Sequence, residues 1–214
     1  MIKPHTIIQA YAITLIFFNI PHWIQAQEVI YYDDGAIKGR GEILNEKREG
    51  EWNWYYPNGT INAIEQYKNG ELAGKIFYYD FDGNLQAVEN WNSGVLEDSS
   101  FYYYPNGKLE KSGTYENGLY EGIWKFFYEN GNLKREGYYV NGVPNKTWKF
   151  YDERGRLVQK GQFSDGVEEG RWEFFRKNQT LEYSGYYRDG EKVEPWYYFD
   201  KKGNKEEISL KDQN

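Results

Sequence analysis

The sequence predicts an all-β fold, an elongated single-layer antiparallel β-meander or solenoid of 24-residue hairpin repeats. A pattern of aromatic runs and glycine turns returns every 24 residues without a gap. A sustained period of this size indicates a repeat array, which is one continuous body rather than a set of separate domains. Aromatic residues make up 20% of the chain, while the mean hydropathy is only −0.92. We therefore expect aromatic burial across a thin sheet, without a thick aliphatic core.

The repeats can be followed from residue 27 to residue 204. The units begin at Gln27, Glu51, Lys75, Ser99, Ile123, Thr147, Arg171 and Pro195, and the last unit is partial. The first unit has Glu46 where later units place their second turn glycine, and terminal repeats are often atypical because one side faces water. Residues 205–214 are polar and charged, so we expect them to form a fraying tail.

Residues 1–26 have the layout of a secretory signal peptide. Lys3 precedes an apolar run from Ile7 to Ile20, and a polar end leads to Ala26. This predicts cleavage near Ala26 and export to the periplasm or the extracellular space; an uncleaved membrane anchor is the alternative. Cleavage would remove both histidines and take the net charge from −7 to −8, because Lys3 is the only charged residue lost. An acidic chain of this kind argues against nonspecific binding to nucleic acid.

The positions of the glycines predict where the turns lie and how the strands pair in register. Asn-Gly and Asp-Gly between aromatic runs are the strongest local hairpin signal, because type I′ turns need positive φ at both central residues. A two-residue loop at Asn130-Gly131 places Trp124 opposite Gly137. The same rule pairs Trp148 with Gly161 and Trp172 with Gly185. We therefore predict that each of these tryptophans covers the bare backbone of its cross-strand glycine.

Alternation along the strands sorts the side chains onto two faces. One face of the central unit is the more apolar and carries Trp124, Phe126, Tyr128, Leu133, Gly137 and Tyr139. The other face is mixed, but it has an aromatic residue in every unit from the one that begins at Glu51 onwards. This candidate aromatic stripe consists of Tyr55, Tyr79, Tyr103, Phe127, Tyr151, Phe175 and Phe199.

The glycine spacing resembles that of the MORN repeat, in the variant found in bacterial proteins. Gly113, Tyr115, Gly118, Gly122 and Trp124 carry the pattern once. It returns at Gly161, Phe163, Gly166, Gly170 and Trp172, whereas Lys146 and Glu194 replace its last glycine in two copies. The resemblance covers about Gln27 to Asn204 and implies a single-layer array of hairpins that binds or scaffolds partners. Some bacterial members are labelled antitoxin-like, a role that export away from a cytosolic toxin disfavours.

The residues argue against an enzyme and against a metal cofactor. The chain has no cysteine, and without the first 26 residues it has no histidine, so thiol–imidazole and Ser–His–Asp mechanisms are excluded. Asp80, Asp152 and Asp200 share one repeat position beside aromatic residues, which suggests carboxylate-dependent glycoside hydrolysis as a weak alternative. We favour ordinary turn residues there. Ca²⁺ binding is also disfavoured, because the spacing of its known loops is absent.

Three functions remain open at the level of sequence. The first is an exported, non-enzymatic protein that presents an extended sheet surface to a protein partner. The second is a carbohydrate- or envelope-binding module in which the aromatic stripe stacks on sugar rings. The third and weakest is the hydrolase. Neither the partner nor the oligomeric state follows from the residues.

Overall fold

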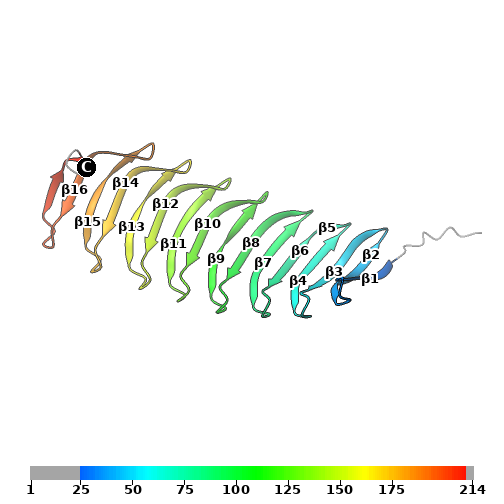
Figure 1. Ribbon diagram of the computed structural model, residues 1–214. Helices are drawn as coiled ribbons and strands as arrows, with labels where there is room; N and C mark the ends of the chain where they lie inside the picture. Colours follow the sequence, from blue (N-terminus) through cyan, green and yellow to red (C-terminus); the bar gives the residue numbers. More distant parts are fainter. Residues whose placement is uncertain (1–24, 211–214) are drawn as a thin grey trace, which may run out of the picture.

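The computed structural model describes residues 25–210 and is entirely β. Figure 1 shows a single row of hairpins that runs from the blue N-terminal strands to the red C-terminal strands, with no helix over either face. Among residues 25–210 there is accordingly no helix that could cross a membrane. The signal-peptide segment up to residue 24 lies outside the described residues, and so do residues 211–214.

Seventeen strands form one antiparallel sheet, which confirms the predicted fold class. Consecutive strands pair as neighbours throughout, except that the two-residue β5 precedes β6 on the same partner, β4. The strands are β1 Gln25–Tyr31, β2 Ile37–Leu44, β3 Lys47–Tyr55, β4 Ile61–Lys68, β5 Glu71–Leu72, β6 Gly74–Tyr79, β7 Leu85–Asn92, β8 Val95–Tyr103, β9 Leu109–Glu116, β10 Leu119–Phe127, β11 Leu133–Val140, β12 Val143–Tyr151, β13 Leu157–Ser164, β14 Val167–Phe175, β15 Leu181–Arg188, β16 Glu191–Phe199 and β17 Lys205–Ile208.

The tail prediction was wrong for residues 205–208. They form β17, which pairs with β16 through Ile208 opposite Trp196. The pairing satisfies backbone groups that would otherwise face solvent on the edge of β16.

The two turns of each unit are of different kinds. At Asn141-Gly142 both residues have positive φ, 49° and 79°, and Val140 pairs with Val143, so this is the predicted two-residue type I′ turn. At the other turn, only Gly131 has positive φ, at 91°. Its N–H donates to the carbonyl of Tyr128 at 2.8 Å, and the Tyr128 N–H donates to the carbonyl of Asn132 at 2.8 Å. This is a three-residue loop, a type I turn closed by a left-handed glycine, and the predicted two-residue loop at Asn130-Gly131 was wrong.

The three-residue loop changes the face to which side chains next to it point. The strand register is confirmed, with Trp124 opposite Gly137, and the corresponding pairs form around Trp148 and Trp172. The register then shifts between Phe126 and Phe127, so that Leu133 pairs with Phe127. Residues directly opposite each other point to the same face. Leu133 therefore lies on the face of the aromatic stripe, which corrects its predicted place beside Trp124.

A second irregularity bends the sheet. Glu121 pairs with Thr114 and Lys125 with Ser112, so three residues of β10, numbers 122–124, lie opposite the single Gly113 of β9. Gly122 has φ +69° at this bulge, and the equivalent positions in other units also have positive φ: Gly50, Gly74, Asp98, Lys146 and Gly170. Lys146 thus adopts the glycine conformation that the repeat requires. Bulges of this kind bend the strand that contains them.

The ring contacts reveal how sharp the bend is. The rings of Tyr120 and Trp124 are stacked with centroids 3.7 Å apart and planes 18° apart. An extended strand would separate positions four apart by about 13 Å. The face that carries Trp124 is therefore concave, because the segments of each hairpin on either side of the bulge fold towards each other over that face. This explains how a single-layer sheet buries Trp52, Trp124, Trp148, Trp172 and Trp196 to between 0% and 4% exposure.

Candidate functional site

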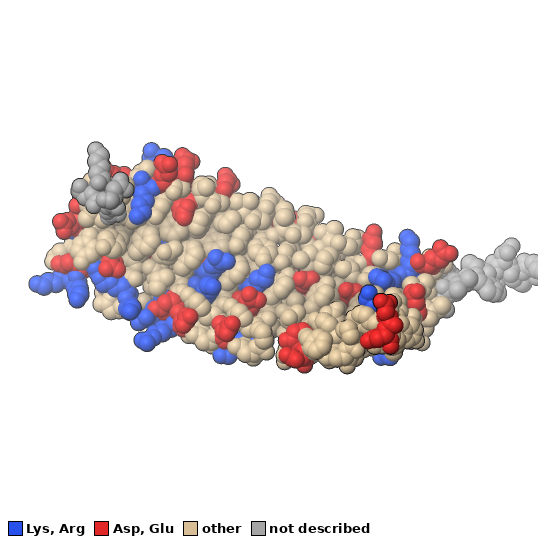
Figure 2. Space-filling model, in the orientation of Figure 1, with Lys and Arg blue, Asp and Glu red and all other residues tan. Residues whose placement is uncertain are grey.

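The concave face carries the buried tryptophans of the array and the ring contacts around them. The Tyr115 ring packs edge-on against the Trp124 indole, the Tyr139 ring packs edge-on against Tyr120, and Phe126 lies farther along the strand from Trp124. Ring contacts of the same kind recur from Tyr115 to the C-terminal units, and Trp52, Trp54 and Tyr67 form a separate group near the N-terminal end. On the side seen in Figure 2, uncharged residues form a band along the array, and charged side chains gather towards its borders and ends.

Each tryptophan covers a glycine, but a different glycine from the predicted one. A β-carbon added to Gly113 would lie far inside 3.0 Å of the Trp124 indole, a separation that real β-carbons do not show. Gly137, the register partner of Trp124, is instead covered by Trp148. The predicted pairs Trp124–Gly137, Trp148–Gly161 and Trp172–Gly185 are thus neighbours in register without being covering contacts. The bulge explains the difference, because it places the indole over the preceding strand.

Five covering contacts join a glycine to the tryptophan eleven residues later: Gly41 to Trp52, Gly113 to Trp124, Gly137 to Trp148, Gly161 to Trp172 and Gly185 to Trp196. A sixth contact, between Gly39 and Trp54, spans fifteen residues. At the two equivalent positions without tryptophan, Ile76 and Ser100, glutamate takes the place of the glycine. Glu65 precedes Ile76, and Glu89 precedes Ser100, by the same eleven residues. Ile76 and Ser100 are fully buried, and the hydroxyl of Ser100 has no hydrogen-bond partner among the described residues.

Glu65 and Glu89 make the concave face acidic in the units that begin at Glu51 and Lys75. The Tyr102 hydroxyl donates to Oε1 of Glu89 at 2.7 Å, and the Trp91 indole N–H donates to its Oε2 at 3.0 Å. The Tyr67 hydroxyl donates to Oε2 of Glu65 at 2.6 Å, and the Trp54 indole N–H donates to the same oxygen. Carboxylates held by two donors each are fixed in place on this face.

The tyrosines here resist ionisation. Burial, followed by the hydrogen bond to Glu65, raises the pKa of Tyr67 to about 12. Burial also raises the pKa of Tyr102, with further contributions from the Tyr115 and Glu89 hydrogen bonds, and it raises the pKa of Tyr78 in the field of Glu89. These phenols therefore stay neutral hydrogen-bond donors at physiological pH.

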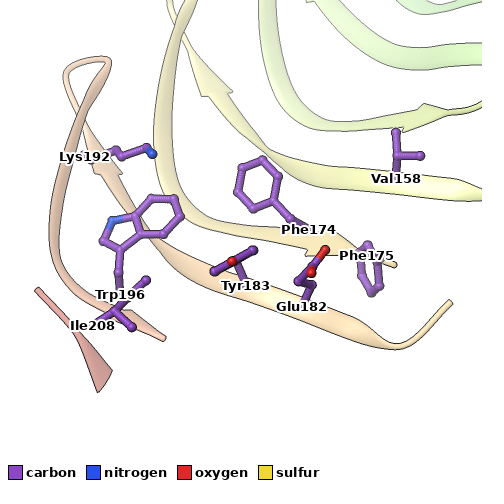
Figure 3. Close-up of a pocket in the computed structure, with 8 residues that line it drawn as sticks. All are labelled: Val158, Phe174, Phe175, Glu182, Tyr183, Lys192, Trp196 and Ile208. Carbon is purple, nitrogen blue, oxygen red and sulfur yellow. The ribbon is translucent and has the colours of Figure 1, made fainter. Parts of the chain in front are cut away.

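A cavity of about 570 Å³ opens at the C-terminal end of the concave face. It is lined by Val158, Phe174, Phe175, Glu182, Tyr183, Lys192, Trp196 and Ile208. Figure 3 shows Lys192 directed towards the space between Phe174 and Trp196, whose centroids are 6.0 Å apart, and its Nζ lies 4.7 Å from the Trp196 ring. Apolar walls with a few charged groups are typical of binding sites.

The predicted aromatic stripe lies on the opposite, convex face, and all seven of its residues are half-buried. Tyr103 is paired with Leu109, as Phe127 is with Leu133, so an aliphatic side chain stands beside the ring. The stripe also links neighbouring units through its backbone, because the Tyr128 hydroxyl donates to the carbonyl of Tyr151 at 2.8 Å. The stripe therefore has a structural role, and most of the surface of each of its residues is covered.

Asp80, Asp152 and Asp200 are loop caps. In Asp152, Oδ1 accepts from the N–H groups of Arg154 and Arg156, both at 3.0 Å, and Oδ2 pairs with the Arg156 guanidinium at 2.6 Å. The side-chain hydrogen bond from Arg156 holds the pKa of Asp152 below its usual value, and Asn84 does the same for Asp80. Two units, or four strand spacings of about 4.8 Å, separate Asp152 from Asp200, which is some 19 Å. Glycosidase carboxylates lie about 5–10 Å apart, so the array does not bring these residues together.

The described residues contain no group of three or more His, Cys, Asp or Glu placed to hold a metal ion.

The family model for the MORN repeat variant matches residues 48–69, 99–117 and 120–141. The chain is a MORN-repeat protein. The third match spans β10, its three-residue loop and β11, so one MORN repeat corresponds to one complete hairpin.

Other comparisons add little to the MORN repeats. No curated protein matches the chain. Among solved structures, a GtfA/B complex bound to UDP and GlcNAc is 10% identical with a TM-score of 0.25, over 66% of this chain and 24% of that one. TcdB2–TccC3 without its hypervariable C-terminal region is 12% identical with a TM-score of 0.24, over 89% of this chain and 13% of that one. The chain thus spans a quarter or less of the length of these structures.

Sequence reasoning missed the acidic part of the MORN array. Counting register within a hairpin sets Glu65 opposite Trp52 and Glu89 opposite Ile76, and these pairs do not reveal what the two glutamates share. The signal was present in the eleven-residue spacing from each glycine or glutamate to the following tryptophan position. Reading that spacing would have grouped the two glutamate units together and marked them as different from the rest.

Proposed function

We propose that this MORN-repeat protein is an exported, non-enzymatic interaction protein that binds a segment of a partner protein along its concave face. The supporting observation is that the concave face combines an extended aromatic lining with cavities at separate units, of about 570 Å³ near Trp196 and about 470 Å³ near Ala87. Buried aromatic anchors surrounded by polar groups are the features that provide affinity at protein interfaces. Export is inferred from the layout of residues 1–26 alone.

The absence of an enzymatic role is part of the proposal. It is supported by the wide separation of Asp80, Asp152 and Asp200 and by their use as loop caps. An antitoxin-like role is a special case of protein binding and would need a partner in the same compartment.

The experiment uses residues 27–214, immobilised and exposed to the envelope fraction, with retained proteins identified by mass spectrometry. One variant alters the concave face, Tyr183→Ala, whose side chain is 37% exposed beside the C-terminal cavity. Two matched variants alter the stripe, Tyr79→Ala and Tyr151→Ala. We expect one partner to be lost with Tyr183→Ala and retained with both stripe variants, provided that all three keep the wild-type circular dichroism spectrum.

The carbohydrate-binding alternative has its own outcome in this design. Binding to a glycan array that disappears with Tyr79→Ala or Tyr151→Ala, and persists with Tyr183→Ala, would replace protein binding by envelope or sugar recognition through the stripe. Hydrolytic activity that is abolished by Asp152→Asn would refute the non-enzymatic assignment.

A further inference from the structure

Two tyrosines on the concave face stand on either side of one small residue. Tyr78 of β6 and Tyr102 of β8 are both register partners of Ala87 in β7, the strand between them. Since neighbouring strands lie about 4.8 Å apart, the two side chains rise from positions about 10 Å apart. We call this arrangement the Ala87 clamp. A group centred between the rings would lie about 5 Å from each, which is within the range of cation–π attraction.

The next two clamps along the array have the same construction and are filled by cations of the chain itself. Lys111 is the register partner of both Tyr102 and Phe126, and its Nζ lies 4.1 Å from the Tyr102 centroid. Arg135 is the partner of both Phe126 and Phe150, and its guanidinium lies 4.3 Å from the Phe126 centroid. In each of these clamps the cation rises from the central position and lies over one of the two flanking rings, so the repeat geometry accommodates a cation beside a clamp ring.

The Ala87 clamp has the rings without the cation. The methyl group of Ala87 leaves a cavity of about 470 Å³, whose walls include Tyr78, Tyr102, Glu89 and Glu110. Within residues 25–210, no lysine or arginine lies over the Tyr78 ring, and Lys111 is the cation that lies over Tyr102. The clamp thus differs from its filled neighbours in two ways, since it lacks its own cation and it has carboxylates in its walls.

The side chains around the clamp carry a net negative charge, which is opposite to the charge of a bound cation. Residues 51–98 contain eight acidic and two basic side chains. Glu89 is held by the Tyr102 hydroxyl and the Trp91 indole, so its charge is fixed at the edge of the cavity. A surface of this kind attracts cationic groups and repels anionic ones.

We propose that the Ala87 clamp binds a lysine side chain from a partner protein, with its ammonium group between Tyr78 and Tyr102 and close to Glu89. The ligand takes the place that Lys111 takes in the neighbouring clamp. This inference rests on the proposed function, because it states which chemistry the partner segment presents to the concave face.

The first test is calorimetric titration of the protein with the peptide Ac-(Gly-Lys)₃-NH₂ and with a matched peptide that has norleucine in place of lysine. We expect the lysine peptide to bind at least about tenfold more tightly, which corresponds to about 1.4 kcal/mol, and its affinity to fall as salt is raised. Equal affinities for the two peptides would overturn the proposal.

The second test fills the clamp from within. Ala87→Lys places a cation where Lys111 stands in the next clamp, and we expect it to weaken the lysine peptide by about tenfold or more. Glu89→Gln removes the fixed charge and should weaken binding without adding bulk. Gln159→Lys is the matched control, because Gln159 occupies the same position between Phe150 and Phe174 and a lysine there should leave peptide binding unchanged.

The results separate this inference from the proposed function. Wild-type peptide affinity in folded Ala87→Lys and Glu89→Gln would eliminate the clamp as the site. A captured partner that is lost with Tyr183→Ala and still bound by Ala87→Lys would also eliminate it, while leaving the concave-face function standing. Clamp-dependent peptide binding without any captured partner would support the clamp and count against the proposed function alone.

Discussion

The indole of Trp124 lies on the backbone of Gly113, in the preceding strand, while its register partner Gly137 lies under the indole of the next unit. Each tryptophan therefore connects one repeat to the repeat before it. This arrangement ties neighbouring hairpins together along the array, as expected for repeat proteins whose stability depends on interfaces between neighbours. It also explains why a unit that loses the glycine loses the following tryptophan as well.

The covering contact predicts a specific energetic coupling. Gly113→Ala forces a methyl group into the Trp124 ring and should reduce the free energy of unfolding by about 1–3 kcal/mol. In a double-mutant cycle with Trp124→Leu, a coupling of about 1 kcal/mol or more is expected, measured by urea denaturation. Gly137→Ala is the control: it should be destabilising through Trp148 but couple to Trp124→Leu by less than about 0.5 kcal/mol. Equal couplings for the two glycines would contradict the observed pairing.

The glutamate units can be converted into tryptophan units. Ser100→Trp alone must place an indole where the Glu89 side chain lies, whereas Ser100→Trp with Glu89→Gly recreates the arrangement of Trp124 and Gly113. We expect the double variant to be more stable than the sum of the two single changes predicts, by about 1–3 kcal/mol. Additive effects in thermal or urea unfolding would show that glycine and tryptophan do not act as a unit.

The tyrosine hydroxyls that link units make a smaller contribution. Tyr128→Phe removes the 2.8 Å hydrogen bond to the Tyr151 carbonyl and should cost about 0.5–1.5 kcal/mol of unfolding free energy. Tyr186→Phe provides the comparison, because Tyr186 is 41% exposed and an exposed substitution should stay within about 0.5 kcal/mol. Should both variants have the same urea midpoint as the wild type, the inter-unit hydrogen bond would contribute nothing measurable.

The free energy of unfolding of the array should fall as the pH rises through the alkaline range. The pKa of Tyr67 is about 12 in the folded chain, against about 10 in an unfolded one. Because the folded value is the higher, the stabilisation is fully present below pH 10 and is lost as the pH rises from about 10 to about 12. Tyr67→Phe should therefore show a shallower fall in unfolding free energy over that range. An identical pH profile for variant and wild type, measured by denaturation at fixed pH values, would refute the assignment.

Local features of the fold could be predicted because neighbouring residues decide them. Both residues of Asn141-Gly142 need positive φ, so the dipeptide itself predicts the type I′ turn. Asp152 caps its own loop by hydrogen bonds to residues two and four positions away, so its ordinary structural role could also be expected. The loop at Gly131 was harder, because one extra loop residue leaves the pairing from Gly122 to Phe126 as predicted and shifts it only beside the loop, where Leu133 moves to the other face.

The sequence by itself determined the period, the all-β class and the pairing within each hairpin, since these depend on turn residues and alternation along short strands. The tertiary structure alone decided which glycine each tryptophan covers, which face is concave, and where Glu65 and Glu89 meet the tyrosines. The physical reason is the bulge at residues 122–124, where three residues oppose Gly113. A bulge between hairpins bends the sheet and shifts contacts between units, and its geometry depends on two strands at once rather than on any single run of residues.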